Sequence, residues 1–127
     1  MTPRTNNASP TAITGRLKKA RAFAEAARIV LEFQHEDVDL SSSYVTLVVH
    51  AGIAASDVLC MRKLKVYSRG ESHTDAVNLL KQAEPGAAKH LDALLSLKTK
   101  AGYSIDGIST SDLKQAQRAI NALLDLL

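Results

Sequence analysis

The fold is decided by the stretch Tyr44–Leu64, which reads YVTLVVHAGIAASDVLCMRKL. Its first part, Val45–Val49, would suit a β-strand if it stood alone, but the apolar pattern continues over a length that strands rarely reach. The residues near its middle are small, which lets neighbouring backbones approach closely; they are Ala51, Gly52, Ala54, Ala55 and Ser56. We therefore expect a long helix from about Ser42 to Tyr67 at the centre of the protein, covered on more than one side.

The composition favours the same class of fold. Hydrophobic residues make up 46% of the 127 residues, but aromatic residues only 4%. The apolar content is mostly Ala, Leu, Val and Ile, which suits closely packed helices better than a sheet. A chain of this length can bury a core without metals or disulfides. The formal net charge of +3 permits a polyanionic partner without requiring one.

The single cysteine, Cys60, excludes an intrachain disulfide and fits a reducing cytosol. It lies inside the apolar helix, so it is expected to be inert packing and not a nucleophile. Residues Met1–Thr11 lack the apolar run of a signal peptide. The longest apolar stretch, Val45–Cys60, contains His50 and Asp57 and is too short to span a bilayer. We expect a cytoplasmic protein without membrane association.

Four more helices are expected around the central one, from capping residues and from Pro or Gly at their ends. Their predicted spans are Thr14 to about His35, Ser72 to Glu84, Ala87 to Ala101, and a last helix opened by Ser109-Thr110-Ser111-Asp112. Residues 1–12 contain Pro3 and Pro10 and no periodic apolar positions, which predicts a disordered tail. Residues 13–127 are then a single all-α domain, an antiparallel bundle of four or five helices.

The turn before the third helix holds the pair of residues best equipped for chemistry. Arg69 lies four residues before His73, across Gly70. His73 falls at a helix start, where the dipole disfavours imidazolium, so its neutral ring could act as a general base. An Arg beside it can bind a phosphate. These two side chains are the fewest that can cleave RNA, because the 2′-hydroxyl of the RNA itself is the nucleophile. The alternative is that His73 only occupies a capping turn and Arg69 is a solvated basic residue.

A run of basic residues precedes this turn. Arg62, Lys63 and Lys65 lie just upstream of Arg69. They could bind a nucleic-acid backbone. A helix C-terminus also favours positive charge because of the helix dipole, so the same residues could serve the helix alone.

A second polar pair lies within the central helix. His50 and Asp57 are seven residues apart, so they share one helix face, two turns from each other. They could share a polar pocket, or be a satisfied polar pair, or one of the two could be exposed. His35 and His90 are expected to face solvent.

Other catalytic and metal-binding patterns are missing from the sequence. It contains no HExxH, no Cys/His cluster with zinc spacing, no Gly-rich phosphate loop after a strand and no nucleophile elbow. We expect neither a bound metal nor a cofactor.

The order of these features resembles the HEPN superfamily (higher eukaryotes and prokaryotes nucleotide-binding), and most closely its short actinobacterial members. The resemblance rests on an Ala-rich second helix, a basic turn with Arg and His, and the ending Lys98-x-x-Ala101-x-Tyr103 of the fourth helix. A last helix opened by Ile108–Asp112 follows. The similarity covers about Thr14 to Leu127.

The resemblance implies a helical bundle that dimerises. Many HEPN proteins are metal-independent ribonucleases of toxin–antitoxin, phage-defence or RNA-processing systems, and others bind nucleotides, RNA or protein without catalysis. Catalytic members use Arg, then four to six residues, then His, with two copies meeting at the dimer interface. Here three residues separate Arg69 from His73. By the same resemblance Asp57 would be the supporting polar residue from the second helix.

Two hypotheses follow. In the first, the chain is a HEPN-type endoribonuclease or RNA-binding protein in which Arg69 anchors a phosphate, His73 acts as acid and base, and Asp57 orients one of them. In the second, it is a non-catalytic helical module that dimerises or binds a cognate partner protein.

Overall fold

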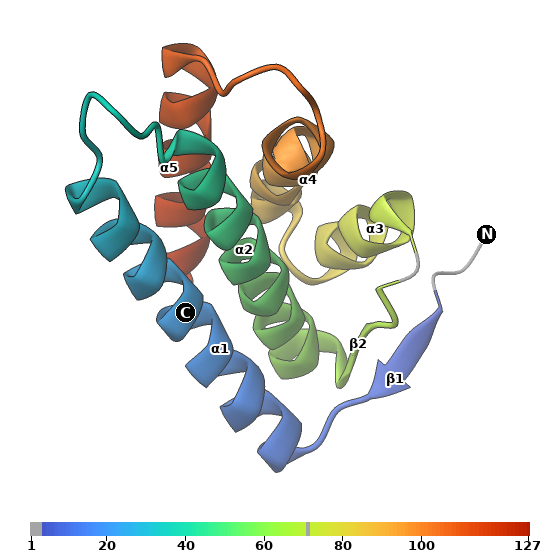
Figure 1. Ribbon diagram of the computed structural model, residues 1–127. Helices are drawn as coiled ribbons and strands as arrows, with labels where there is room; N and C mark the ends of the chain where they lie inside the picture. The colour runs from blue at the N-terminus through green and yellow to red at the C-terminus, as the bar shows by residue number, and fades with distance from the viewer. Residues whose placement is uncertain (1–3, 71) are drawn as a thin grey trace.

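The computed structural model describes residues 4–70 and 72–127, and this part of the chain is mostly helical. Its elements, in chain order, are β1 (Thr5–Asn7), α1 (Pro10–Glu32), α2 (Ser41–Leu64), β2 (Val66–Ser68), α3 (His73–Ala83), the 3₁₀ turn η1 (Pro85–Ala87), α4 (Ala88–Gly102) and α5 (Thr110–Leu124). The predicted helical class is confirmed, with a small two-stranded sheet added. Figure 1 shows the helices packed around α2, with α1 and α3 on opposite sides of it.

Helix α2 is the centre of the fold because its sequence is apolar on all sides. It packs against each of the other four helices, and most of its residues from Tyr44 to Met61 are buried. The whole helix is longer than the predicted apolar stretch Val45–Cys60, and by length and composition alone it could cross a membrane. However, 78% of its most apolar window lies buried inside the fold, as in the core helix of a soluble protein.

The start of the chain differs from the sequence-based prediction. Helix α1 begins at Pro10 and is capped by Ser9, whose side chain accepts a hydrogen bond from the backbone N–H of Ala12. Thr14, the predicted cap, lies inside the helix. Pro10 begins the helix instead of breaking it, since the first helical position needs no N–H donor and suits its fixed φ.

The predicted disorder of residues 1–12 is also corrected where the structure describes them. Thr5, Asn6 and Asn7 form β1, which pairs antiparallel with β2 so that Thr5 lies opposite Ser68. The pairing extends beyond the strands, because Ala8 N donates to Lys65 O at 2.9 Å and Arg69 N donates to Arg4 O at 3.1 Å. Residues 1–3 lie outside the described part of the chain.

The second helix ends earlier than expected, and its remainder becomes β2. Lys65 takes the left-handed conformation at φ 63°, and its N–H donates to Met61 O. This conformation ends a helix by satisfying one of its last carbonyls. The chain then turns into the extended segment that β1 covers.

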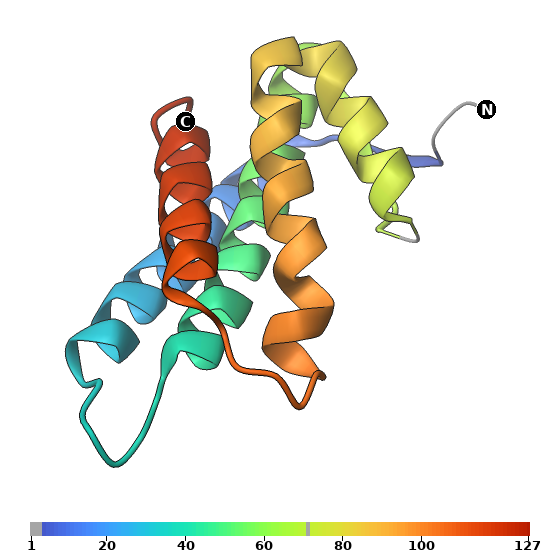
Figure 2. The same ribbon diagram turned by 90° about the horizontal axis from the view of Figure 1, so that it is seen from above.

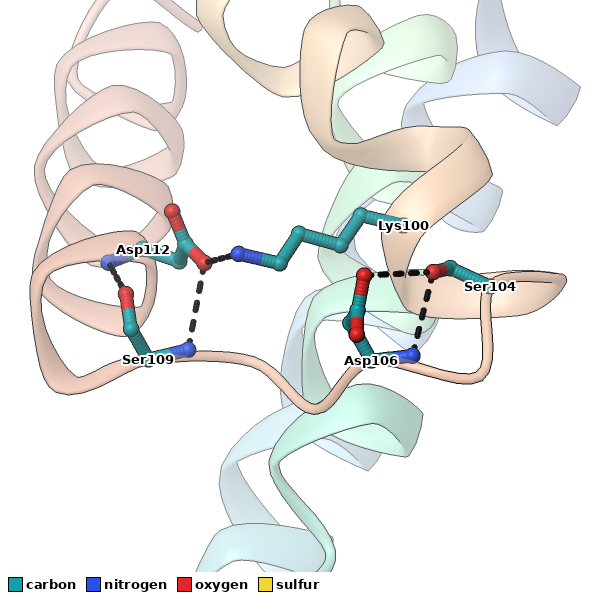
Figure 3. A network of polar contacts seen from close by, with 5 residues as sticks. All are labelled: Lys100, Ser104, Asp106, Ser109 and Asp112. Carbon is teal, nitrogen blue, oxygen red and sulfur yellow. Dashed lines mark hydrogen bonds and ion pairs between the residues drawn. The ribbon is translucent and has the colours of Figure 1, made fainter.

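Helices α3 and α5 follow the predicted capping signals, whereas α4 begins at the 3₁₀ turn without a side-chain cap. Ser72 caps α3 by accepting from Asp75 N, and Ser109 and Asp112 form a reciprocal capping box at α5. Lys100, from the end of α4, reaches across to the Asp112 carboxylate (Figure 3), and Lys100 Nζ lies 2.6 Å from Asp112 Oδ2. Asp112 thus holds both the start of α5 and the end of α4, and the pKa of its carboxyl is lowered by the Lys100 hydrogen bond first and the Ser109 N–H second.

The close approach predicted from the small residues of α2 occurs at Gly52. A Cβ placed there would overlap Leu94 Cδ1 on α4 and would lie 3.6 Å from Leu123 Cδ1 on α5. All five helices contribute to one buried cluster, which includes Ala20, Val48, Leu80, Leu94 and Leu123.

Candidate functional site around the Arg69–His73 turn

The turn that carries Arg69 and His73 connects β2 to α3. Its backbone is held at both ends: Arg69 N donates to Arg4 O of the N-terminal segment, and Ser72 accepts from Asp75 N inside α3. Gly70 has φ +78°, a conformation that favours glycine, and its N–H donates to Ser68 Oγ at 3.1 Å. The turn therefore starts from the β1–β2 ribbon, the two-stranded sheet, and ends at the Ser72 cap of α3. Both ends of the turn are fixed by these hydrogen bonds.

Both predicted catalytic side chains are exposed. His73 is the first residue of α3, and Arg69 follows β2 directly. Within residues 4–70 and 72–127, neither side chain has a hydrogen bond or ion pair. Neither lines either of the two pockets described below. A single chain therefore presents Arg69 and His73 to solvent on one short turn and does not enclose them in a cleft.

Asp57, the predicted supporting residue, has a partner on a different element. Its carboxylate lies 3.3 Å from Arg16 Nε of α1, and the residue is only 6% exposed. Burial raises the pKa of Asp57 to about 7, and the Arg16 guanidinium opposes this effect only in part. Burial has the larger effect because the Arg16 side chain is 39% exposed, so that solvent screens its charge.

Arg16 was not singled out by the sequence, yet it joins three elements. Besides its ion pair with Asp57 of α2, its guanidinium carbon lies 5.7 Å from the centre of the Tyr67 ring in β2. This is within the range of a cation–π contact. The buried carboxylate, the arginine and the ring therefore tie β2, and with it the start of the turn, to the two long helices.

The three residues predicted to bind nucleic acid are all engaged in contacts within the protein. Arg62 donates to the backbone oxygen of Leu127 at 2.9 Å, and Lys63 Nζ lies 3.6 Å from Glu84 Oε1. Lys65 Nζ donates to Arg62 O at 3.2 Å. The Lys65 contact is the one expected at a helix C-terminus, where cations meet the last carbonyls, whereas Arg62 and Lys63 contact other parts of the chain. The side chains are exposed, so the contacts leave them accessible.

The His50–Asp57 pair does not share a pocket. His50 is exposed and stacks on Phe23 of α1 with ring centroids 5.3 Å apart, whereas Asp57 is buried beside Arg16. Of the three alternatives for this pair, the structure therefore shows the one in which a single member, His50, is exposed. Cys60 is buried, and burial raises the pKa of its thiol to about 12, which keeps it protonated near neutral pH.

Two pockets lie away from the turn. A small one of about 180 Å³ is lined by His50, Lys98 and Tyr103, among others. A larger groove of about 750 Å³ runs between α1 and α5 over α2. In the described part of the chain, no group of three His, Cys, Asp or Glu residues is placed to hold a metal ion.

The chain matches no known protein-family model, and no curated protein or solved structure is significantly similar to it.

Proposed function

We propose that the chain is a HEPN-like cytoplasmic protein that acts on RNA, as a metal-independent endoribonuclease or an RNA-binding protein of a toxin–antitoxin or defence type. The observation that carries the proposal is the exposure of Arg69 and His73 on a turn whose two ends are fixed by the ribbon and by the Ser72 cap. A site that takes a polymer has to be open, because the strand must pass through it.

The proposed chemistry needs only these two side chains and the RNA itself. Arg69 binds the phosphate by charge-assisted hydrogen bonds. His73 takes the proton from the 2′-hydroxyl, whose oxygen attacks the adjacent phosphorus, and His73 then gives this proton to the 5′-oxygen of the next nucleotide as the bond from that oxygen to phosphorus breaks. The products are a 2′,3′-cyclic phosphate and a 5′-hydroxyl. Asp57 does not touch the turn residues in the described contacts; through Arg16 and Tyr67 it positions β2.

The test is cleavage of a labelled single-stranded RNA in EDTA by wild type, Arg69→Ala and His73→Ala. His35→Ala is the matched control, because His35 is also an exposed histidine but lies in the loop after α1. Loss of the acid/base group should lower the rate about 100-fold or more, with His35→Ala unchanged. An inactive wild type, or equal cleavage by all four proteins, would contradict the ribonuclease proposal.

A second candidate is the non-catalytic helical module that dimerises or binds a partner protein. The observation that favours it is that Arg62, Lys63 and Lys65 all make contacts within the protein. The two candidates differ in RNA binding: an RNA-binding turn should give an affinity that falls steeply with salt and weakens in Arg69→Ala. If the wild-type protein neither binds nor cleaves RNA at low salt, the RNA function is excluded and the non-catalytic module is supported.

A further inference from the structure

The groove between α1 and α5 has the size and the lining of a small-molecule site. Its volume is about 750 Å³, and aliphatic side chains from three helices form its floor, namely Ala24 and Leu31 of α1, Val48 of α2, and Ile120 and Leu124 of α5. Figures 1 and 2 show α1 and α5 beside α2, away from α3. Pockets that hold small molecules usually measure about 300–1,000 Å³, are mostly apolar, and often lie between the helices of a bundle.

The groove is elongated along the helices. Its α1 wall extends from Arg21 to Glu32, which corresponds to about 16 Å of helix. Tyr44, near the loop that joins α1 to α2, hydrogen-bonds Gln117 near the start of α5 and marks one end of the groove. Arg21, near the middle of α1, therefore lies toward the other end. An aliphatic floor of this shape suits a straight hydrocarbon chain better than a compact ring system.

The charges on the rim distinguish one end of the groove from the other. Arg28 bonds to both Glu25 and Glu32, and the hydrogen bond from Arg28 lowers the pKa of Glu25. These three side chains therefore satisfy one another. Arg21 also lines the groove, and it has no ion pair or hydrogen bond from its side chain in the part of the chain that the structure describes. Its guanidinium is available to an anion.

We propose that the groove binds a medium-chain fatty acid, with the carboxylate on Arg21 and the hydrocarbon chain along the aliphatic floor. A guanidinium matches a carboxylate with two parallel N–H donors. The chain covers the floor and removes apolar surface from water, which favours binding in proportion to the chain length. The proposal goes beyond the RNA function and does not rest on it, because no residue of the turn from Arg69 to His73 lines the groove.

The experiment titrates the full chain with four probes by calorimetry, each below the concentration at which it forms micelles. The probes are octanoate, butyrate, 1-octanol and octyltrimethylammonium. Octanoate should bind once per chain and at least about tenfold more tightly than butyrate, which has a shorter chain to bury. It should bind about fivefold or more tightly than 1-octanol, which lacks the charge. Octyltrimethylammonium should bind more weakly still, since its charge repels Arg21.

Two variants separate the head group from the chain. Arg21→Gln should lower the affinity for octanoate to that for 1-octanol and leave 1-octanol binding unchanged. Lys19→Gln is the matched control, since Lys19 is exposed on α1 but does not line the groove, and it should bind octanoate as wild type does. Ala24→Phe should weaken octanoate and 1-octanol alike, because the ring occupies the floor. Circular dichroism shows whether each variant keeps its fold; Arg21 is exposed, so Arg21→Gln tests the proposal even if Ala24→Phe unfolds.

Methyl resonances locate the bound chain. Octanoate should shift the methyl signals of Ile120 and Leu124, which line the groove, and leave those of Val77 on α3 unchanged. Shifts confined to other parts of the protein would place the probe elsewhere and overturn the proposal.

Three further results would contradict it. The first is a wild type that binds none of the probes, which would mean that a protein surface covers the groove. The second is equal affinity for octanoate and octyltrimethylammonium, which would mean that the groove is only apolar. The third is equal weakening by Arg21→Gln and Lys19→Gln. None of these measurements involves RNA, so this proposal and the proposed function fail separately.

Discussion

Asp57 is a carboxylate placed where the surrounding residues favour its neutral form. It lies in the buried part of α2, and its one ionic partner in the described chain, Arg16, is partly exposed. Burial raises the pKa of this carboxyl and the charge of Arg16 lowers it, and the effect of burial is the larger of the two. Elsewhere in the protein the balance is reversed: Asp112, at a helix N-terminus beside Lys100, has a lowered pKa.

These shifts predict a pH dependence of stability with a definite sign. The folded-state pKa of Asp57, about 7, lies above its ordinary value of 3.8. Between these values the folded protein binds more protons than the unfolded chain, so the contribution of Asp57 to stability is greatest below pH 3.8 and falls as the pH rises to 7. The full shift corresponds to roughly 4 kcal/mol. The Asp57→Asn side chain cannot ionise, so its contribution to the free energy of unfolding should not fall as the pH rises.

The measurement is the free energy of unfolding of wild type and Asp57→Asn by urea between about pH 4 and 8, which spans the titration. The difference, variant minus wild type, should grow in favour of the variant up to about pH 7 and then level off. In Arg16→Gln the loss of stability should continue to a higher pH, because the charge that opposes the shift is gone. A difference that is constant with pH would mean that Asp57 ionises as an exposed carboxylate does.

Gly52 and Gly15 test, at the scale of helices, whether close packing or helix propensity decides the effect of a glycine. Ala is normally preferred over Gly inside a helix by about 1 kcal/mol. Gly15 in α1 has open space, so Gly15→Ala should stabilise the protein by roughly that amount. Gly52→Ala pushes a methyl group against Leu94, which is fully buried, so it should destabilise by about 1–2 kcal/mol.

A Leu94→Ala background separates the two effects, because it removes the carbon that the new methyl would meet. The destabilisation by Gly52→Ala, measured by thermal melting, should disappear there. If Gly52→Ala stabilises the wild-type background, the α2–α4 contact is looser than the structure shows.

The helices could be predicted because each carries its own signals, such as the unbroken apolar pattern of α2 or the Ser109–Asp112 capping box. The errors occur where two local signals compete. Both Ser9 and Thr14 can cap a helix, and the choice falls on Ser9 because Pro10 is already suited to the first turn. The contacts of Asp57 could not be predicted in the same way, since nothing in the spacing of the sequence identifies Arg16, on another helix, as its partner.

The β1–β2 ribbon shows the limit of local reasoning for the whole molecule. Thr5–Asn7 is a short polar segment that would not form a strand alone, and its partner lies beyond two complete helices. The pairing exists because α1 and α2 run antiparallel and bring the segment before α1 beside the segment after α2 (Figure 1). The predicted catalytic turn therefore depends on a segment that the sequence indicates is disordered.

Removing residues 1–8 tests this dependence. Ser9 and Pro10 remain, so α1 keeps its cap, and the buried cluster, which contains none of the removed residues, is intact. The exposed ribbon should contribute only about 1 kcal/mol or less to unfolding, as is usual for surface features. Its local effect should be larger, because the Arg69 N–H loses Arg4 O as its acceptor.

Hydrogen exchange measured residue by residue distinguishes the local effect from the global one. The amide of Arg69 should exchange faster in the truncated protein, while amides within α2 should keep their protection. If Arg69 anchors RNA, cleavage or binding should weaken in parallel, although Arg69 and His73 are both still present. Unchanged protection of the Arg69 amide would mean that the turn is held from the α3 side alone, by the Ser72 cap, and that the N-terminal strand is not part of the site.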